Sequence, residues 1–303
     1  MKETNEAVVV CFGEVLWDIL PTGSHPGGAP MNVAYHLKAL GSKPVIISKV
    51  GIDKYGEQLV EILAQHGVIT EYVQVDFQLP TGLVYADITN HQEVSYDIVF
   101  PSAWDFIEPK DEFIPLLQQA EYFVYGSLTS RNKTSRNTLY NLLDIAKTNV
   151  LDINLRVPHY NQKEIQYLLQ RSNILKMNEA ELDLITAWIK PVQHIEERMK
   201  LVQDWFNIET VIVTLGGDGA NIINNGSFFK HKGYQITVAD TIGSGDAFLA
   251  GFLNRKLHGC TIAEALDFAS AVGAFVATRH GACPAYSIEQ VSALITPHSS
   301  IVS

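Results

Sequence analysis

The 303-residue chain has few cysteines, and they lie far apart. Cys11, Cys260 and Cys283 are odd in number and show no C-x-x-C spacing. Neither a disulfide framework nor a cysteine-based zinc site therefore has support. Isolated cysteines in apolar or helical sequence are typical of buried thiols in a reducing compartment, so we expect a cytoplasmic protein.

Long apolar runs are missing as well. The longest charge-free apolar stretch of note, 268–278, has eleven residues, whereas a helix that crosses a membrane needs roughly 20. At the N-terminus, Lys2, Glu3 and Glu6 precede only the short apolar run 8–11. This region is too acidic and too short for a secretory signal, so we expect neither a membrane span nor a cleaved leader.

Basic residues are scarce. The chain has 22 Lys and Arg against 33 Asp and Glu, which gives a net charge of -11 and a pI of about 5.3. A protein without a basic surface cannot neutralise a run of phosphates, so nucleic acid and anionic membranes are not expected partners. Hydrophobic residues make up 47% and charged residues 18%, which is the composition of a folded chain rather than a disordered one.

What is present is an alternation of strand-like and helix-like segments. The runs 8–11 and 44–50 have strand length, and between them Met31, Ala34 and Leu37 recur at the spacing of one helix face. Such units predict a mostly parallel sheet with helices on both faces, in one α/β domain over 1–303. Further strands are expected at 122–125, 150–153, 174–177 and 211–215, and helices at 134–147, 162–171 and 195–206.

The stretch 68–100 has a different pattern. Short alternating strands are expected at 82–88 and 93–100, with Pro80 before them and the turn-like pair Asn90-His91 between them. We interpret them as a small antiparallel sheet inserted in the α/β domain. Together with 14–20, residues 82–100 are expected to form a lid.

One glycine-rich turn combines the features that phosphoryl transfer needs. Gly243, Ser244 and Gly245 directly precede an expected helix whose first turn holds Asp246. Unpaired amides at a helix start can bind an anion, and a carboxylate there can accept a proton from an attacking hydroxyl. The alternative is a plain glycine turn with an aspartate in the first helical turn, which the helix dipole favours.

Other glycine motifs do not fit. A dinucleotide-binding G-x-G-x-x-G would need a third glycine where Phe248 stands, and a P-loop would need a Gly-Lys pair, which the chain lacks. Ser244 lies directly between two glycines rather than in G-x-S-x-G, and no H-E-x-x-H occurs. Hydrolase and zinc-enzyme interpretations are therefore not supported.

Two long motifs carry a family resemblance. They are the segment 240–252 and an earlier one that reads Gly27-Gly28-Ala29-Pro30-x-Asn32-x-Ala34, with Gly41 and Gly51 further on. Both are similar to the signatures of the ribokinase, or PfkB, family of ATP-dependent carbohydrate kinases. The order of elements between them is similar too, so the resemblance covers nearly the whole chain. It implies a ribokinase-like α/β fold with a central, mostly parallel sheet flanked by helices, and a small β-lid.

The resemblance assigns roles at the turn. It makes Asp246 the general base and the amides of Gly243, Ser244 and Gly245 an anion hole for the transferring phosphoryl group. The helix N-terminus is expected to keep Asp246 ionised and weakly basic.

For the sugar, the resemblance assigns Asp18, Gly28 and Asn32 as partners of hydroxyl groups. Asp152-x-Asn154-x-Arg156 resembles a run found in fructokinases and sugar-acid kinases, so Arg156 is a candidate substrate contact; an ion pair with Asp152 or another carboxylate is the alternative. Trp17 and Phe100 are left out of the site, because isolated aromatic residues are more often part of the core.

For ATP and Mg²⁺, the resemblance assigns Asn178, Thr214, Gly216, Gly219 and Glu181, the last acting on Mg²⁺ through water. Asn178 and Glu181 also fit a helix capping box, and the two glycines fit a hairpin turn. Asp218 has no assigned role, and Ala269-Ser270-Ala271 departs from the Ala-Asn-Ala that many members place against adenine. Some members hold potassium with backbone oxygens, which correspond here to Asp240, Ile242, Val276, Arg279, Gly281 and Ala285.

The function expected from the resemblance is transfer of the γ-phosphoryl group of ATP to a primary hydroxyl of a small neutral sugar, with fructose first. A 2-keto-3-deoxygluconate, ribose or nucleoside kinase is the alternative within the family, and a sugar-sensing protein without catalysis is the alternative outside enzymes. Sugar and ATP are the expected partners, with a homodimer as a further option. No Lys or Arg occurs between Lys2 and Lys38, which favours a neutral substrate over an anionic one.

Overall fold

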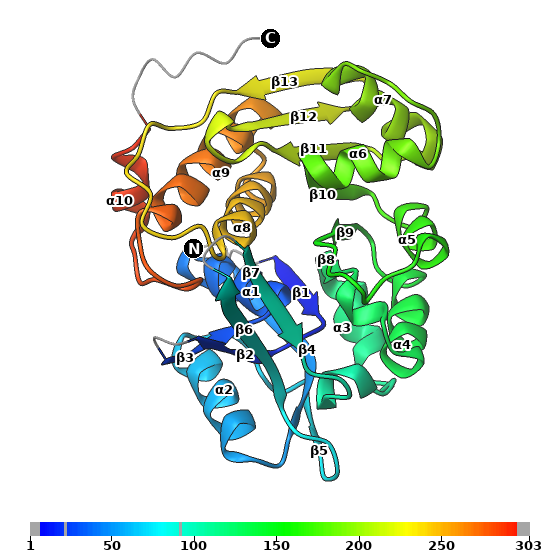
Figure 1. Cartoon of the computed structure of the whole chain (residues 1–303), viewed down its shortest axis with the longest axis vertical. Helices are drawn as coiled ribbons and strands as arrows, with labels where there is room; N and C mark the ends of the chain where they lie inside the picture. Colours follow the sequence, from blue (N-terminus) through cyan, green and yellow to red (C-terminus); the bar gives the residue numbers. More distant parts are fainter. Residues whose placement is uncertain (1–6, 21–22, 91–92, 296–303) are drawn as a thin grey trace, which may run out of the picture.

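A computed structural model of the chain describes residues 7–20, 23–90 and 93–295 (Figure 1). Its main element is a nine-stranded sheet with the order β13-β12-β11-β10-β9-β8-β1-β4-β5. The pairs from β11 through β5 are parallel, and β12 and β13 are added antiparallel at one edge. The strands are β1 (Val8–Phe12), β4 (Lys43–Gly51), β5 (Val73–Asp76), β8 (Ala120–Gly126), β9 (Asn149–Asp152), β10 (Ile174–Asn178), β11 (Thr210–Thr214), β12 (Ala220–Asn224) and β13 (Ser227–His231).

Helices cover both faces of this sheet, as Figure 1 shows. One side carries α1 (Ala29–Ala39), α2 (Lys54–Gln65), α8 (Ser244–Leu257), α9 (Ile262–Ala277) and α10 (Ile288–Ser292). The other side carries α3 (Phe113–Gln119), α4 (Lys133–Leu143), α5 (Gln162–Leu169), α6 (Glu179–Ala187) and α7 (Ile195–Phe206).

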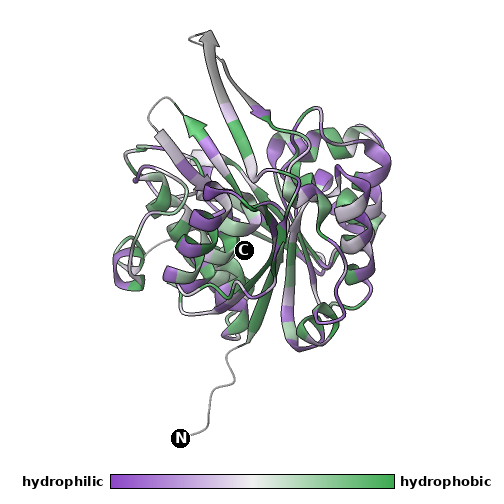
Figure 2. Cartoon of the chain, turned by 90° about the horizontal axis from the view of Figure 1, so that it is seen from below, coloured by the Kyte–Doolittle hydropathy of each residue, from purple (hydrophilic) through white to green (hydrophobic). Residues whose placement is uncertain are grey.

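The two-sided burial explains why the central strands are apolar throughout. In β1, Val9 and Cys11 belong to the core cluster on one face, whereas Val10 and Phe12 belong to the cluster on the other. Figure 2 shows these hydrophobic strands between helices whose outer sides are largely hydrophilic. Successive residues of a strand point to opposite faces, so a strand buried on both faces has no polar alternation.

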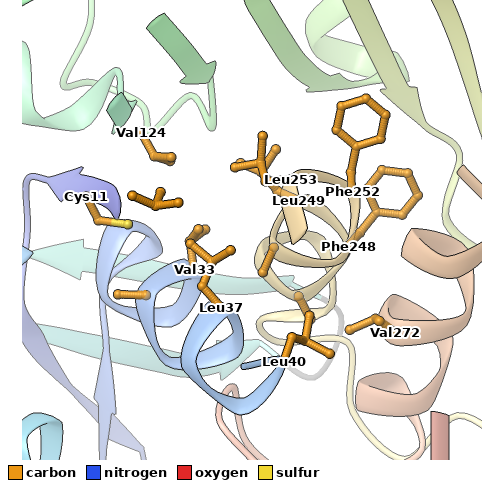
Figure 3. Packing of buried hydrophobic residues seen from close by; sticks show 14 of the residues in the cluster. Cys11, Val33, Leu37, Leu40, Val124, Phe248, Leu249, Phe252, Leu253 and Val272 are labelled. Atoms are coloured by element: carbon orange, nitrogen blue, oxygen red, sulfur yellow. The ribbon is translucent and has the colours of Figure 1, made fainter. Parts of the chain in front are cut away.

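Helix α1 packs against α8, and this contact brings distant parts of the chain together. Figure 3 shows Val33 and Leu37 of α1 near Leu249 and Leu253 of α8. All four side chains are buried. The first signature motif and the glycine turn before α8 are thereby held in the same part of the molecule.

The ribokinase-like arrangement and the alternating elements expected from the sequence are confirmed, with differences in detail. Helix α4 ends at Leu143 rather than at 147, and the Asn149 side chain donates to the Leu143 carbonyl at 3.0 Å, which satisfies one of the last helix acceptors. Strands β5, β12 and β13 were not expected. β5 and β13 are the two edge strands, and β12 lies between β13 and β11, so pairing with a neighbour rather than a long apolar run defines these strands.

A second, small sheet stands apart from the first. It has the order β3-β2-β6-β7, formed by β2 (Leu16–Leu20), β3 (Gly23–Gly27), β6 (Gly82–Asn90) and β7 (Glu93–Ile98). The pairs β2·β3 and β6·β7 are antiparallel, but β2·β6 is parallel, so the sheet is mixed rather than purely antiparallel. Strand β3 was not expected, and part of the predicted Asn90-His91 turn lies outside the described residues. In the described part of the chain, the helices are too short or too polar to span a membrane.

Candidate active site

A pocket of about 660 Å³ lies between the small sheet and the carboxyl ends of the central parallel strands. Ligands of open α/β sheets bind at this edge. The pocket receives side chains from the ends of β9, β10 and β11, from β2 and β3, and from the start of α8. Its polar lining includes Glu14, Asp18, His25, Asn32, Asp152, Asn154, Arg156, Lys176, Asn178, Glu181, Thr214 and Asp246.

The turn before α8 faces the pocket with free amides. Gly243 has a φ of 73°, and a Cβ there would lie 2.7 Å from Ala282, so the turn needs glycine. The Ser244 amide donates to the Thr241 carbonyl at 3.2 Å. Within the described chain, the amides of Gly243 and Gly245 have no acceptor. Free amides at a helix start are a binding site for a phosphate group.

Asp246 is the third residue of α8, yet its carboxylate turns toward α1. Its Oδ2 accepts a hydrogen bond from Asn32 Nδ2 at 2.8 Å. Burial raises the pKa of Asp246 to about 6, and the charge of Asp152 adds to this, while Lys176 and Asn32 lower it. Burial therefore makes Asp246 more basic than its place at a helix N-terminus alone indicates. At neutral pH the group is mainly ionised and is a stronger base than an ordinary aspartate.

A buried ion pair beside Asp246 was missed from the sequence. Lys176 Nζ lies 2.6 Å from Asp152 Oδ2, and both side chains are less than a tenth exposed. The two residues are direct partners in the register of β10 and β9. Burial alone would lower the pKa of Lys176, but the charges of Asp152 and Asp246 raise it, so the ammonium persists. Its Nζ is only 3.2 Å from where a Cβ on Gly245 would lie, which places a positive charge next to the amide turn.

Asp18 lies on the small sheet, above the first signature motif. A Cβ on Gly27 would lie 2.3 Å from Asp18 Oδ2, so the glycine makes room for this carboxylate. Burial raises the pKa of Asp18 to about 6, while the charges of Arg156 and His25 lower it. His25 lies opposite Asp18 in the antiparallel pair β2·β3 and also lines the pocket. Sequence analysis missed His25 because it did not identify β3.

Glu14 lines the pocket next to the start of α1. It is 3% exposed, and its carboxylate accepts from the Ala29 amide at 3.3 Å and from Thr129 Oγ1 at 3.2 Å. Burial raises the pKa of Glu14 to about 7. Gly28 has a φ of 112°, and a Cβ there would lie 2.3 Å from the Glu14 carbonyl oxygen. The second glycine of the motif is thus required by backbone geometry, and it lines the pocket as expected.

Arg156 lines the pocket, but it does not pair with Asp152, whose partner is Lys176. The residue is exposed, and its Nη1 donates to the Leu155 carbonyl at 3.3 Å. Its charge lowers the pKa of both Asp18 and Asp246. The structure therefore brings Arg156 near the two carboxylates while leaving its guanidinium accessible to a ligand.

Asn178 and Glu181 form the capping box of α6 and also line the pocket. Asn178 Oδ1 accepts from the Glu181 amide at 2.9 Å, and Glu181 Oε2 accepts from the Asn178 amide at 2.8 Å. The other oxygen, Glu181 Oε1, accepts from the Leu155 amide at 2.7 Å. The capping box is confirmed, and each carboxylate oxygen keeps a second lone pair for water, so the role on Mg²⁺ stays a prediction.

The turn 215–219 joins β11 to β12 as a hairpin. Thr214 lines the pocket, but Gly216 and Gly219 are not among its lining residues. A Cβ on Gly219 would lie 2.1 Å from the His231 carbonyl oxygen, so close approach of the chain explains this glycine. Asp218 lies in the exposed part of the turn and still has no assigned role.

Of the residues expected around a monovalent cation, Asp240, Ile242 and Gly281 line the pocket. The Asp240 carboxylate accepts from the amides of Ile242 at 2.9 Å and Gly281 at 3.0 Å, which ties two loops together. The remaining candidates, Val276, Arg279 and Ala285, do not line it. The Val276 carbonyl accepts from the Arg279 amide at the end of α9. Among the described residues, no cluster of three His, Cys, Asp or Glu groups forms a metal site.

The order and spacing of these motifs match a known family. The sequence model of the pfkB family carbohydrate kinases matches residues 9–289. The chain belongs to this family. It is a sugar kinase, which transfers a phosphoryl group to a carbohydrate hydroxyl.

Several relatives of this pfkB-family kinase extend over nearly the whole chain. A protein named probable fructokinase-7 from Arabidopsis thaliana is 30% identical, over 96% of this chain and 93% of its own length. A crystal structure of Vibrio cholerae fructokinase with fructose, ADP and calcium bound superposes with a TM-score of 0.84 at 26% identity, over 96% of this chain and 99% of that one. Aminoimidazole riboside kinase from Salmonella enterica has a TM-score of 0.81 at 25% identity, over 95% and 99%.

Ser270 stands at the one position where the chain departs from the family motif on α9. Its side chain is buried, and its Oγ has no hydrogen-bond partner among the described residues. A buried hydroxyl without a partner costs free energy.

Proposed function

We propose that this pfkB-family kinase transfers the γ-phosphoryl group of ATP to a primary hydroxyl of a small neutral sugar, with fructose as the first candidate. The observation that carries the proposal is the position of Asp246. Its carboxylate lies at the start of α8, held by Asn32 at 2.8 Å, in a pocket that also contains the free amides of Gly243 and Gly245. Fructokinases among the relatives support fructose.

In the proposed reaction, Asp246 accepts the proton of the sugar hydroxyl as that oxygen attacks the γ-phosphorus and the bond to the ADP oxygen breaks. The amides of Gly243 and Gly245 stabilise the charge on the transferring group. Phosphoryl transfer passes through a loose transition state, so positioning and electrostatic stabilisation supply most of the rate enhancement. The Lys176 ammonium, next to Gly245, adds a positive charge at the same place.

The donor set fits a magnesium ion held through water. Glu181 and Asn178 line the pocket, and both oxygens of Glu181 already accept backbone hydrogen bonds, which leaves lone pairs suited to water rather than direct coordination. Mg²⁺ gives up its waters reluctantly, so such an arrangement suits it. When bound, the ion would neutralise charge on the ATP phosphates.

The charge of the pocket supports a neutral substrate. Lys176 is already paired with Asp152, so Arg156 is the cation left for an anionic sugar. A carboxylate or phosphate on the substrate would be desolvated beside carboxylates, at a cost of several kcal/mol. We expect a neutral sugar to exceed a sugar acid in kcat/KM by at least about tenfold. The lining includes six acidic side chains, Glu14, Asp18, Asp152, Glu181, Asp240 and Asp246, and two Lys or Arg, Arg156 and Lys176.

The small sheet is proposed to close over the sugar. Leu16, Val84 and Ile98 of this sheet are buried together with Trp104 and Leu128, and all of them except Trp104 line the pocket. An apolar cover excludes water, which otherwise competes with the sugar for the phosphoryl group. ADP release without sugar is therefore expected to be slow. Equal rates with and without sugar would contradict closure.

The proposed function is tested by coupled ADP release with fructose, ribose, adenosine and 2-keto-3-deoxygluconate at equal concentrations. Fructose is expected to give the highest kcat/KM. Preference for the sugar acid would show that Arg156 outweighs the acidic lining. Preference for adenosine would place the chain with nucleoside kinases, and binding of sugar without ADP release would identify a sensor.

A further inference from the structure

A buried histidine that was not predicted as a site residue connects α1 to the loop between α9 and α10. His36 lies on α1, one helical turn after Asn32, and is completely buried. Its Nε2 lies 2.9 Å from the Ala282 carbonyl oxygen, and its Nδ1 lies 2.9 Å from the Tyr286 hydroxyl. Both partners belong to the loop between α9 and α10, so His36 fastens this loop to α1, the helix whose Asn32 side chain donates to Asp246.

The partners of His36 determine its tautomer. Burial lowers the pKa of His36 to about 4, so the ring is neutral at neutral pH. A carbonyl oxygen can only accept, so Nε2 carries the proton and donates to Ala282. The unprotonated Nδ1 then accepts from the Tyr286 hydroxyl. Each ring nitrogen thus has a defined and different role.

The Ala282 carbonyl also packs against the turn before α8, at Gly243. A Cβ on Gly243 would lie 2.7 Å from the oxygen, Cα and Cβ of Ala282. The same oxygen that accepts from His36 therefore lies directly against Gly243. The donor at His36 therefore holds a carbonyl group that lies beside this turn.

A second contact links the same loop to the base. Cys283 Sγ lies 3.4 Å from Asn32 Oδ1, and Asn32 Nδ2 donates to Asp246 at 2.8 Å. Burial raises the pKa of the Cys283 thiol, which keeps it protonated and able to donate. The thiol contact fixes the amide of Asn32 with its nitrogen toward Asp246. Ala282 and Cys283 are adjacent in this loop. Ala282 packs against the turn at Gly243, and Cys283 contacts Asn32, which donates to Asp246.

We propose that His36 is a positioning residue for phosphoryl transfer, which acts by holding the Ala282 carbonyl against the turn at Gly243. The inference rests on the proposed function, because it assigns the turn to the transferring phosphoryl group. It predicts a loss in the rate of transfer and not in the binding of sugar or ATP, since His36 itself does not line the pocket.

The two ring nitrogens can be tested separately. The amide nitrogen of Gln lies about as far from Cα as Nε2, whereas the amide of Asn reaches only the position of Nδ1. His36→Gln therefore keeps the donor to Ala282, and His36→Asn keeps only the Tyr286 contact. We expect His36→Asn and His36→Ala to lower kcat by about tenfold or more, with both KM values within about threefold of wild type. His36→Gln is expected to retain most of kcat.

A matched control separates positioning from general damage. His231 is also buried, and its ring contacts Asp267 at 3.1 Å and the Gly233 amide at 3.0 Å, but it lies on the edge strand β13. We expect His231→Gln to leave kcat unchanged at temperatures below its melting transition. Melting temperatures of all variants are measured alongside. Equal kcat in His36→Gln and His36→Asn, or a loss of kcat that follows melting temperature across all variants, would overturn the proposal.

The outcome can be distinguished from failure of the proposed function. If the wild type phosphorylates no sugar in the panel, the proposed function is contradicted, and hydrogen exchange of the unliganded protein tests the positioning itself. The amide of Gly281, which donates to Asp240, is expected to exchange faster in His36→Asn than in His36→Gln. If the Gly281 amide exchanges at the same rate in the two variants, this result alone overturns the positioning role of His36.

Discussion

The ion pair between Lys176 and Asp152 allows a quantitative test of how charge near Gly245 affects the rate of phosphoryl transfer. Lys176→Met removes the ammonium while keeping an unbranched side chain of similar length. The single variant has two effects, because it also leaves Asp152 buried without its partner. Removing one member of a buried pair costs about 3–5 kcal/mol of stability. The single variant therefore confounds folding with catalysis.

The catalytic effect can be worked out from the geometry. Lys176 Nζ lies 3.2 Å from the position of a Cβ on Gly245. For a phosphoryl oxygen about 5 Å from Nζ, and an effective dielectric constant of about 20, the attraction between unit charges is about 3 kcal/mol. Part of this attraction is also present before transfer. A loss in kcat of about 10²-fold is the corresponding expectation.

The double variant Lys176→Met with Asp152→Asn separates the two effects. Without the buried carboxylate, the melting temperature is expected to recover most of what the single variant loses. The value of kcat, measured by coupled ADP release at saturating sugar and ATP, is expected to stay below wild type but to recover part of the loss of about 10²-fold, because Asp152→Asn also removes a charge that repels the phosphoryl group. A double variant with wild-type kcat would show that Lys176 only neutralises Asp152, and would refute a direct effect on the phosphoryl group.

Three further predictions concern the base, the sugar and the fold. Because Asp246 must be ionised to accept a proton and its pKa, like that of Asp18, is about 6, kcat/KM is expected to fall by at least about tenfold per unit below pH 6; a flat profile down to pH 5 would contradict this. Asp18→Ala is expected to raise KM for sugar at least about tenfold with KM for ATP unchanged; equal changes in both would remove Asp18 from the sugar site. Gly219→Ala is expected to lower the melting temperature more than Gly226→Ala, because both have positive φ but only Gly219 faces backbone at 2.1 Å; equal shifts would contradict the clash.

Much of the architecture could be predicted because local pattern determines it. The apolar runs around Val9 and Val211 mark strands buried on both faces. The glycines at 27, 28 and 243 mark places where a side chain would meet another part of the chain, as the distances to Asp18, Glu14 and Ala282 show. At these positions, the glycine itself indicates from the sequence that another part of the chain lies close to the backbone.

The contacts that could not be predicted depend on register and tertiary packing. Lys176 was available as a signal, since it is a charged residue within the apolar strand 174–177. Asp152 pairs with Lys176 and not with Arg156, because the register of β10 and β9 places Lys176 and Asp152 opposite each other. The sequence does not distinguish His36 from other polar residues of a helix, because its role depends on the contact between α1 and the loop at Ala282. The raised pKa of Asp246 likewise follows from burial, which local spacing does not reveal.

The central claim is that Asp246 is the base of a sugar kinase, and Asp246→Asn tests it most directly. The amide keeps the shape of the side chain but cannot accept the proton. Coupled ADP release with fructose and ATP is expected to fall by about 10²–10⁴-fold, with sugar and ATP binding retained by calorimetry. Asp218→Asn, in the exposed turn outside the pocket, is the matched control and is expected to behave as wild type. Wild-type turnover in a folded Asp246→Asn protein would contradict the account.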